Sequence, residues 1–563
     1  MKSAIIELLA RELDGKIDAL TIERLIEIPP SPDMGDFAFP CFSLARVLKK
    51  SPVAIAEGLL HSFTGHDMFE KITAISGYLN FFVNKSLLAR TVLKHVVTEA
   101  YGKASRTVRV VVEFASPNTN KPLHLGHLRN MAIGESVARI LEFSGSMVVR
   151  TSINNDRGVH ICKSMLAYQR LGNGATPESV GKKSDHFVGD YYVLFSKNAE
   201  TDPAWNDEAQ KMLKRWESGD EEVRSLWKTM NGWALGGYAA TYRLFGIRFD
   251  KEYFESDIFT FGKEIIREGL ERGVFSTRDD GAVIIDLSEE KLGEKVLLRP
   301  DGTSVYIVQD LYLAVLKNNE FSYDRSLYVV GNEQEYHFAV LKAIFKRLGY
   351  AIADKIHHLS YGMVELPEGK MKSREGTVVD ADDLIEETAA LAAGEVRTRY
   401  QLDTAEVKER SLKIALAAIK YQLLRVDITK NMLFDPKKAI SFEGDTGPYL
   451  LYSFARASSI LRKAASSESA AAAEPGEMNS SEIALLKKLD FFPEAVAMAT
   501  DKLSPSVIAN YAFEAAQAFN EFYHNSPVIG SESEYFRLQL VTAFRSVLGK
   551  CLRVLGIEEI EEM

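Results

Sequence analysis

The spacing of apolar residues changes along the chain, and each change predicts a different kind of element. Near the amino terminus, apolar residues over positions 3–13 and 42–61 recur as on one face of a helix, and positions 78–83 indicate a strand. Helices and a strand within one short stretch predict a compact α+β region over residues 1–103.

A valine-rich run opens the next region. Positions 108–114 read VRVVVEF, which is too short for a buried helix but suits a central parallel strand. A polar, proline-bounded loop follows at 116–122, and apolar residues then recur at helical spacing from Leu125 until Ser144. With a second strand predicted at 147–153, the order is strand, helix, strand. The loop of such a unit lies at the carboxyl edge of the sheet, where free N–H groups and the helix dipole favour a phosphate.

The pattern becomes helical and charge-rich at about 165–250, which predicts an insertion into the sheet region. Buried strands return at 326–332 and 357–366. From residue 383 onward the apolar spacing is that of amphipathic helices, interrupted by an Ala, Ser and Pro-Gly linker over 463–481. We therefore expect an α/β region followed by a helical bundle.

Composition places the chain among ordinary globular proteins. Its 563 residues predict three or four domains, and 46% of them are apolar while 26% are charged. No run approaches the roughly 18 apolar residues of a membrane span, and the first helix carries charges that an export signal lacks. Cys41, Cys162 and Cys551 are odd in number and scattered, which fits a reducing compartment. We expect a cytoplasmic protein that does not enter a membrane.

Charge is the next constraint on function. A net charge of −10 argues against a protein that coats nucleic acid, but it leaves room for a selective RNA binder with local basic surfaces. Residues 406–438 hold eight Lys or Arg against four Asp or Glu. This excess predicts either an RNA-facing surface or a solvated helix face.

The candidate chemistry lies at the strand-to-helix corner. There HLGH places His124 and His127 at the start of the helix, where imidazoles can donate to phosphate oxygens, and Gly126 leaves room for a nucleotide. A second basic tract, KMKSR, occupies 370–374 far downstream. The short histidine pattern alone is weak, but the two tracts together predict a nucleotide site.

The two tracts resemble the motifs of class I aminoacyl-tRNA synthetases, with HLGH in place of HIGH and KMKSR in place of KMSKS. FASPNTNKPLHLGHLRN, VVGNEQEYHF and ISFEGDTGPYLLYSFARASSILRK resemble arginyl-tRNA synthetases, and the likeness covers nearly the whole chain. It implies a Rossmann-like catalytic domain over 104–382, preceded by a tRNA-elbow-binding α+β domain over 1–103. An all-α anticodon-binding bundle over 383–563 is implied to follow.

The implied activity joins L-arginine to its tRNA. ATP and arginine form arginyl-adenylate, and the arginyl group then passes to the 3′-terminal adenosine. Mg²⁺ would accompany ATP without a dedicated protein site. The resemblance also implies that bound tRNA is needed before arginine is activated. We expect a monomer whose partners are tRNA, L-arginine and ATP.

The resemblance assigns residues to each substrate. The implied catalytic group is His124, His127, Lys121, Lys370 and Lys372, and the implied ATP contacts are His124, Gly126, His127, Met371 and Lys372. Ser373 stands where the second lysine of KMSKS falls, and the family pattern makes Lys121 the compensating lysine.

Arginine recognition requires carboxylates around a planar cation. Tyr306 and Asp310, one helical turn apart, match the family's guanidinium-binding pair, and Glu255 matches a further carboxylate. Around the α-amino group the implied residues are Asn118 and Gln334, with Ser116 and Glu113 beside them. The implied anticodon contacts are Tyr449, Tyr452, Arg456, Asn520 and Tyr523. Phe37 and Phe39 are two aromatics of the first region that would either stack on bases as exposed rings or lie in the core.

Two other readings remain open from the residues alone. One is a class I synthetase for another amino acid, because the two nucleotide motifs are shared across the class. The other is a catalytically silent paralogue that only binds tRNA or arginine, which Ser373 keeps open. Small nucleotidyltransferases that share HxGH lack the helical tail that begins at 383.

Overall fold

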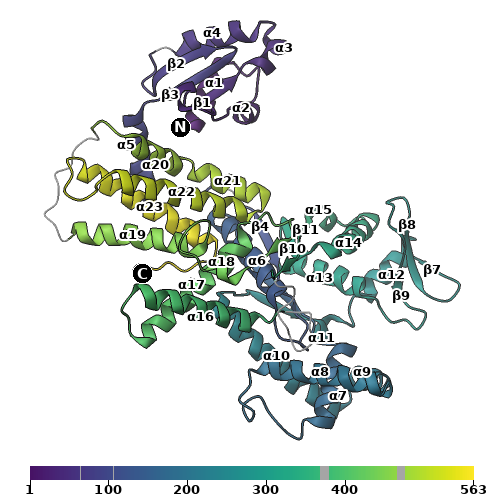
Figure 1. Cartoon of the computed structure of the whole chain (residues 1–563). Helices are drawn as coiled ribbons and strands as arrows, with labels where there is room; N and C mark the ends of the chain where they lie inside the picture. The colour runs from purple at the N-terminus through teal and green to yellow at the C-terminus, as the bar shows by residue number, and fades with distance from the viewer. Residues whose placement is uncertain (64, 105–106, 368–378, 466–475) are drawn as a thin grey trace. The chain divides into compact units, whose positions relative to one another are not determined.

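The computed structural model describes residues 1–63, 65–104, 107–367, 379–465 and 476–563 (Figure 1). These residues divide into two compact units. Unit 1 consists of Met1–Tyr101, Arg456–Pro493 and Glu514–Val547, and unit 2 consists of Gly102–Ala455, Glu494–Phe513 and Leu548–Met563. The expected division into three domains stays a prediction.

Unit 1 contains a three-stranded antiparallel sheet in the order β1-β3-β2. Apolar side chains of the sheet and of the first helices form one core, including Ile5, Leu9, Ile22, Phe39 and Phe81. Up to residue 101 its elements are α1 Lys2–Glu12, α2 Ala19–Leu25, η1 Pro32–Met34, β1 Phe37–Pro40, η2 Phe42–Leu44, α3 Ala45–Leu48, α4 Pro52–Phe63, β2 Phe69–Ile75, β3 Tyr78–Val83 and α5 Lys85–Val96.

One expectation for this region is wrong, and one open alternative is decided. The helix expected over 42–61 is broken, because Lys49 adopts a left-handed conformation with φ 51° and Pro52 starts a new helix. Phe39 is fully buried in the core, so it is not an exposed stacking ring. Phe37 is partly exposed. The strand expected at 78–83 is confirmed as β3.

Unit 2 is built on a five-stranded parallel sheet in the order β11-β10-β4-β5-β6. Its strands are β4 Arg109–Glu113, β5 Met147–Asn154, β6 Lys251–Phe254, β10 Arg325–Gly331 and β11 Ile356–Tyr361. Valines of β4 pair with both neighbours and are buried, as a central parallel strand requires. The α/β region expected from the valine-rich runs is confirmed, as is the Rossmann-like fold that the resemblance implied.

Helix α6, Leu125–Phe143, connects β4 to β5 and is buried along most of its length. Its Arg129 donates to the carbonyl oxygens of Met363, Ile428 and Lys430 at 2.7, 3.3 and 2.8 Å. A fully buried guanidinium that satisfies three carbonyls ties α6 to segments more than two hundred residues away. The helix that carries the histidine motif is thereby fixed in place.

Four helices lie between β5 and β6, where a helical insertion was expected. They are α7 Val159–Leu171, α8 Ser184–Thr201, α9 Ala204–Glu217 and α10 Glu221–Phe245. A three-stranded antiparallel sheet, which sequence reasoning missed, follows later in the unit as β7 Ser276–Thr277, β8 Val283–Leu287 and β9 Gly293–Leu298.

The remaining elements are mostly helices. Those up to residue 365 are α11 Glu255–Ile258, α12 Lys263–Glu271, α13 Tyr306–Phe321, η3 Asn332–Gln334, α14 Glu335–Arg347, α15 Ile352–Lys355 and β12 Val364–Glu365. Those after the gap are α16 Ala381–Arg399, α17 Thr404–Leu424, β13 Met432–Leu433, α18 Pro436–Ala439, α19 Gly447–Ala465, α20 Ser480–Asp490, α21 Phe492–Lys502, α22 Pro505–Asn525 and α23 Glu534–Val554. The helical pattern expected from 383 is interrupted by β13, which pairs with β12.

Three further observations bear on the expectations. Within the described ranges, no helix is both long and apolar enough to span a bilayer. The three cysteines are free and buried. Burial raises the pKa of the Cys41 and Cys162 thiols to about 12 in each case, so neither is poised as a thiolate. Of the linker expected over 463–481, residues 466–475 lie outside the described residues.

Candidate active site

The histidine motif builds its own helix cap. His124 precedes α6, and its Nδ1 accepts from the backbone N–H of Gly126 at 3.1 Å. Nδ1 of His127 accepts from the backbone N–H of His124, also at 3.1 Å, which completes a reciprocal cap. Because each Nδ1 is an acceptor, the proton of each neutral ring is on Nε2, where it can be donated to a ligand.

Both imidazoles are neutral at physiological pH. Burial, with a smaller effect from the nearby Lys121 ammonium, lowers the pKa of His124 to about 4. Burial, reinforced by His124 and Lys121, holds the pKa of His127 well below its usual range. The ring centroids are 3.8 Å apart, so the pair presents two N–H donors without positive charge.

The loop between β4 and the histidines starts with unusual backbone. Ala115 and Ser116 adopt left-handed conformations at φ 70° and 50°, which non-glycine residues rarely do. Hydrogen bonds hold both: Ala115 N donates to Asn130 Oδ1 at 2.6 Å, and Ser116 N donates to Ser152 Oγ at 3.3 Å. This turn directs the chain outward at the carboxyl edge of the sheet.

Helices of the insertion hold the far side of the same loop. The Tyr238 hydroxyl on α10 lies 2.7 Å from the carbonyl oxygen of Asn118 and 2.5 Å from that of Lys121. The Lys121 side chain is exposed, and its ammonium lies 5.2 Å from the ring centroid of Tyr192 on α8. Lys121 is thus anchored by its backbone while its charge stays accessible.

Residues just before α16 pair with the histidine motif. Leu125 N donates to the Val379 carbonyl at 2.8 Å, and Ala381 N donates to the Leu123 carbonyl at 3.0 Å. His124 and Asp380 are therefore antiparallel bridge partners. The other expected nucleotide residues, Lys370, Met371 and Lys372, lie outside the described residues, as does Ser373.

Two carboxylates expected to bind arginine lie on adjacent elements. Glu255 starts α11 directly after β6 and is 6% exposed, whereas Asp310 lies on α13. Burial, with added repulsion from Asp156 and Asp310, raises the pKa of Glu255 to about 7, although Arg157 opposes this from 3.7 Å. Asp310 is therefore close enough to Glu255 to affect its ionisation, as members of one cation-binding site would be.

Helix α13 carries two of the residues expected to bind arginine. Tyr306 is the first residue of the helix, one turn before Asp310, and it is 72% exposed. Asp310 Oδ2 lies 2.7 Å from Nε2 of His337, and this contact raises the pKa of the imidazole. A cationic ligand would thus compete with His337 for Asp310.

The residues expected around the α-amino group differ in how they are held. Glu113 is buried and bonded to the fully buried Lys317 at 2.7 Å, so its charge is already matched inside the protein. Asn118 and Gln334 are exposed. They follow β4 and β10, two adjacent parallel strands, and so lie at the same edge of the sheet.

Family comparisons agree with this geometry. The family model described as tRNA synthetases class I (R), catalytic domain, matches residues 90–436. The Arginyl tRNA synthetase N terminal domain matches 2–83, and the DALR anticodon binding domain matches 450–563. Arginine–tRNA ligases of Treponema denticola and Porphyromonas gingivalis are 48% and 42% identical to this chain. These alignments cover 96% and 94% of the chain, and 94% of each relative.

The chain belongs to the arginyl-tRNA synthetase family. Among solved structures, the arginyl-tRNA synthetase of Thermus thermophilus is similar at a TM-score of 0.82 and 27% identity, with 100% of both chains covered. That of Plasmodium falciparum has a TM-score of 0.80 at 19% identity and supports the fold alone. Class I synthetases use ATP as a substrate, in agreement with a nucleotide site at the histidine motif.

Of the residues expected to contact tRNA in this family, three come together in unit 1. Arg456 Nη1 donates to Asn520 Oδ1 at 2.6 Å, and its guanidinium lies 5.1 Å from the ring centroid of Tyr523. The Tyr523 ring is 42% exposed. In unit 2, Tyr449 packs edge-on against Phe513, and Tyr452 is partly exposed. Both tyrosines are therefore at least partly engaged in helix packing.

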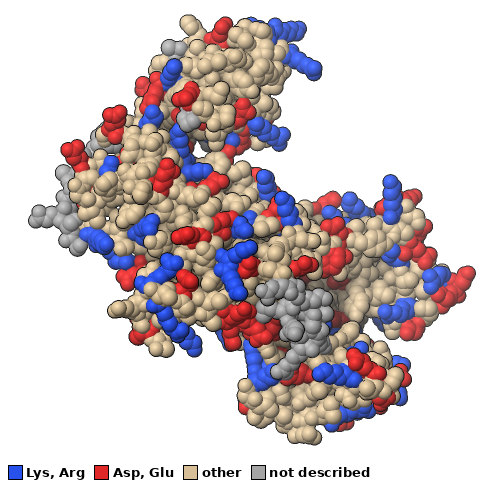
Figure 2. Space-filling model, viewed as in Figure 1, with Lys and Arg blue, Asp and Glu red and all other residues tan. Residues whose placement is uncertain are grey.

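Acidic and basic side chains are interspersed over the face of the molecule shown in Figure 2. This mixture fits a sequence that has 68 basic residues and a net charge of −10. Within the basic stretch 406–438, Lys420 is buried and donates to the Gly556 carbonyl at 2.5 Å. Burial lowers its pKa to about 8. It lines a cavity of about 490 Å³ with Arg139, Arg243, Lys413 and Arg553. The stretch is therefore not one solvated face.

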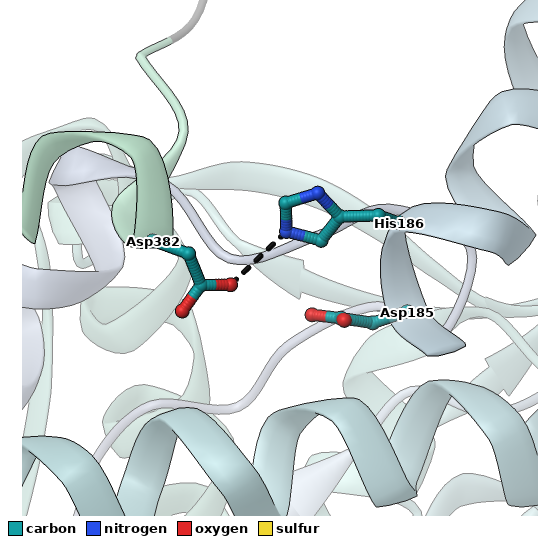
Figure 3. A group of neighbouring side chains, drawn as sticks. All are labelled: Asp185, His186 and Asp382. Atoms are coloured by element: carbon teal, nitrogen blue, oxygen red, sulfur yellow. Dashed lines mark hydrogen bonds and ion pairs between the residues drawn. The ribbon is translucent and has the colours of Figure 1, made fainter. Parts of the chain in front are cut away.

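One group of described side chains has the composition of a metal site. Asp185, His186 and Asp382 bring one ligand atom each within 4.8 Å of one another (Figure 3). The Lys183 ammonium lies 2.5 Å from Asp382 Oδ2 and 3.2 Å from Asp185 Oδ2. The chain's own ammonium thus supplies a cation to this group.

Sequence reasoning missed several residues that contact the carboxylates expected to bind arginine. His337 lies within the quoted VVGNEQEYHF, where its spacing from Asp310 gave no signal. Arg157 follows the carboxyl end of β5, a position at the functional edge of a parallel sheet that would have singled it out. Lys317 gave no signal, because it appears as an isolated lysine in an apolar helix.

Proposed function

We propose that this chain ligates L-arginine to its tRNA in two steps. The carrying observation is that Glu255, whose pKa Asp310 helps to raise, directly follows β6 of the parallel sheet whose strand β4 leads to the neutral donors His124 and His127. In the first step the arginine carboxylate attacks the α-phosphorus of ATP and pyrophosphate leaves. In the second step a terminal adenosine hydroxyl of tRNA takes the arginyl group.

Neither step needs a nucleophile from the protein, so the residues act by positioning and charge. His124 and His127 donate Nε2–H to phosphate oxygens, and Gly126 admits the nucleotide beside the backbone. Lys121, Lys370 and Lys372 supply positive charge as the phosphorus becomes pentavalent, and Met371 joins the ATP contacts. Lys121 compensates for the serine at 373.

Arginine specificity comes from the acidic pocket. The guanidinium lies between Glu255 and Asp310 with Tyr306 as a hydroxyl partner, because a planar fork of N–H donors matches carboxylates. Asn118 and Gln334 bind the α-amino group from the sheet edge. Ser116 shapes the loop backbone there, and Glu113 acts through its bond to Lys317.

The remaining assignments extend the same proposal. Mg²⁺ enters bound to ATP and has no protein site of its own. The one metal-like group named above, Asp185, His186 and Asp382, is already paired with the Lys183 ammonium. Residues 1–103 contact the tRNA elbow, 104–382 carry the catalysis, and the bundle over 383–563 reads the anticodon. The anticodon contacts are Tyr449, Tyr452, Arg456, Asn520 and Tyr523. The protein acts as a cytoplasmic monomer, and it activates arginine only with tRNA bound.

The test is a charging assay with total tRNA, ATP and Mg²⁺, in which each of the twenty amino acids is tried separately. Charging by arginine alone is the expected result. Charging by a different amino acid would make this a synthetase of other specificity. Binding of tRNA without any charging would make it a silent paralogue. A pyrophosphate-exchange assay without tRNA completes the test, because exchange at the full rate would contradict the tRNA requirement.

A further inference from the structure

The first residues of α8 form a network of charged side chains with the start of α16 (Figure 3). His186 Nε2 lies 3.0 Å from Asp382 Oδ2, the oxygen that also contacts the Lys183 ammonium. Thr241 of α10 donates to the other oxygen, Asp382 Oδ1, at 3.0 Å. His186 also lies 3.4 Å from Asp380 Oδ2. Two helices of the insertion therefore grip the segment that starts α16.

That segment is the one that pairs with the histidine motif. Asp380 is both the cap of α16, accepting from Asp382 N at 2.9 Å, and the bridge partner of His124. Backbone hydrogen bonds of 2.8 and 3.0 Å flank the bridge at Leu125 and Ala381. Since paired backbone moves together, a displacement of Asp382 would be passed to His124.

A separate contact brings α8 against the same loop. A Cβ placed on Gly189 of α8 would lie 2.7 Å from Pro122 Cδ, so helix backbone and proline ring are in direct contact. Pro122 comes two residues before His124. The insertion therefore supports the motif both by packing and through the charged network.

The charged groups of the network stabilise one another. Burial by itself would raise the pKa of Asp382, but hydrogen bonds from His186 and Lys183 overcome it and lower the pKa to about 2. Burial likewise opposes protonation of His186, but Asp382, Asp380 and Asp185 together raise its pKa. The charged groups that face His186 are these three carboxylates and the neighbouring Lys183 ammonium.

We propose that Lys183 and His186 are positioning residues for arginine activation. Through Asp380 and Asp382 they fix the backbone of residues 379–381, and this backbone sets the direction in which His124 presents its Nε2–H to the nucleotide. A misplacement of about 1 Å at such a donor can cost roughly a hundredfold in rate. The inference rests on the proposed function, because it assigns both residues to that reaction.

The chain offers a matched control in the adjacent lysine. The side chains of Lys182 and Lys183 are each 28% exposed, but Lys182 pairs with Asp190 of α8 and Lys183 with Asp382 of α16. Lys183→Met should lower kcat of tRNA-dependent pyrophosphate exchange about tenfold while KM for arginine stays within about twofold. Lys182→Met should leave both within about twofold, and Lys183→Arg should restore most of kcat.

Two further variants protect the test against a folding defect. Lys183→Met combined with Asp382→Asn should be no slower than the slower single variant, because both remove one contact. His186→Gln should flatten the decline of wild-type kcat as pH rises through the raised pKa of His186, where the imidazolium is lost. Melting temperatures are measured for all variants.

Equal kcat in the Lys183→Met and Lys182→Met proteins would overturn the proposal. So would a loss of kcat that follows melting temperature and is not restored by arginine at 183, because the role would then be structural only. An inactive wild-type protein would instead contradict the proposed function. The two failures are therefore distinguishable.

Discussion

The nucleotide and arginine ends of the candidate site are prepared in opposite ways. At the nucleotide end, His124 and His127 are neutral and locked by each other and by the backbone of α6. At the expected arginine end, burial, with added repulsion from Asp156 and Asp310, raises the pKa of Glu255 to about 7, and Asp310 contacts His337. The first end is complete before a ligand arrives, whereas at the second a cationic ligand would compete with Arg157 and His337 for the two carboxylates. We therefore expect the nucleotide end to act through fixed geometry, and the arginine end through the exchange of one cationic partner for another.

The largest effect is expected from removing charge at the arginine end. Asp310→Asn should lower kcat/KM for arginine about a thousandfold, or roughly 4 kcal/mol, because the guanidinium loses an ionic partner. KM for ATP should change less than about twofold, since the nucleotide end is untouched. Asp301→Asn, an exposed aspartate earlier in the same segment, is the control. Unchanged use of arginine would remove Asp310 from the pocket.

Glu113 already pairs with a cation inside the protein, so its removal should lower the stability of the fold more than the binding of arginine. Glu113→Gln leaves the buried Lys317 ammonium without a counter-charge, and the free energy of unfolding should fall by about 3 kcal/mol. Urea unfolding measures it. Adding Lys317→Met to the same protein should recover much of the loss, because no buried charge then remains. A stability equal to wild type in the Glu113→Gln protein would show that the pair is not a buried ionic bond.

At the nucleotide end, capping and donation can be separated at one residue. His124→Asn keeps an acceptor for the helix cap but removes the Nε2–H donor, so kcat should fall about a hundredfold with little loss of stability. His124→Ala should lose a further 1 kcal/mol or so of stability. Pyrophosphate-exchange kinetics and thermal unfolding distinguish the two. Wild-type kcat in the asparagine variant would exclude donation by His124.

The smallest effect is a pH dependence at the arginine end. A guanidinium binds the ionised form of Glu255, whose pKa is raised to about 7, so arginine binding should release a proton near neutrality. KM for arginine should therefore rise as pH falls below 7, approaching about tenfold per pH unit. Glu255→Gln should flatten this slope. The same slope in the variant would assign the titration to another group.

The features that depend on residues close together in the sequence could be predicted. The order of β4, α6 and β5 and the i, i+4 spacing of Tyr306 and Asp310 are encoded by neighbours in the chain. A helix break at Lys49 was not predicted, because a left-handed lysine leaves no pattern of apolar residues.

Partnerships between distant residues were not predictable in this way. Lys317 and Glu113 are 204 positions apart, and Lys183 and Asp382 are 199 apart. Each of these residues appears in the sequence as an ordinary charged side chain. Only the folded structure shows that Glu113 is paired with the Lys317 ammonium and that Glu255 is buried near a second carboxylate. The family pattern supplied the names of the pocket residues but not their electrostatic states.

The left-handed pair Ala115 and Ser116 has a consequence for how this enzyme can change over time. Each conformation costs roughly 1 kcal/mol that glycine would avoid, so random mutation selected for heat resistance alone should favour Ala115→Gly or Ser116→Gly. Either change would also loosen the turn that carries Asn118 and the histidines. A substitution that raises the melting temperature at either position should therefore lower kcat. Relatives from hotter habitats would have to gain stability in other parts of the molecule.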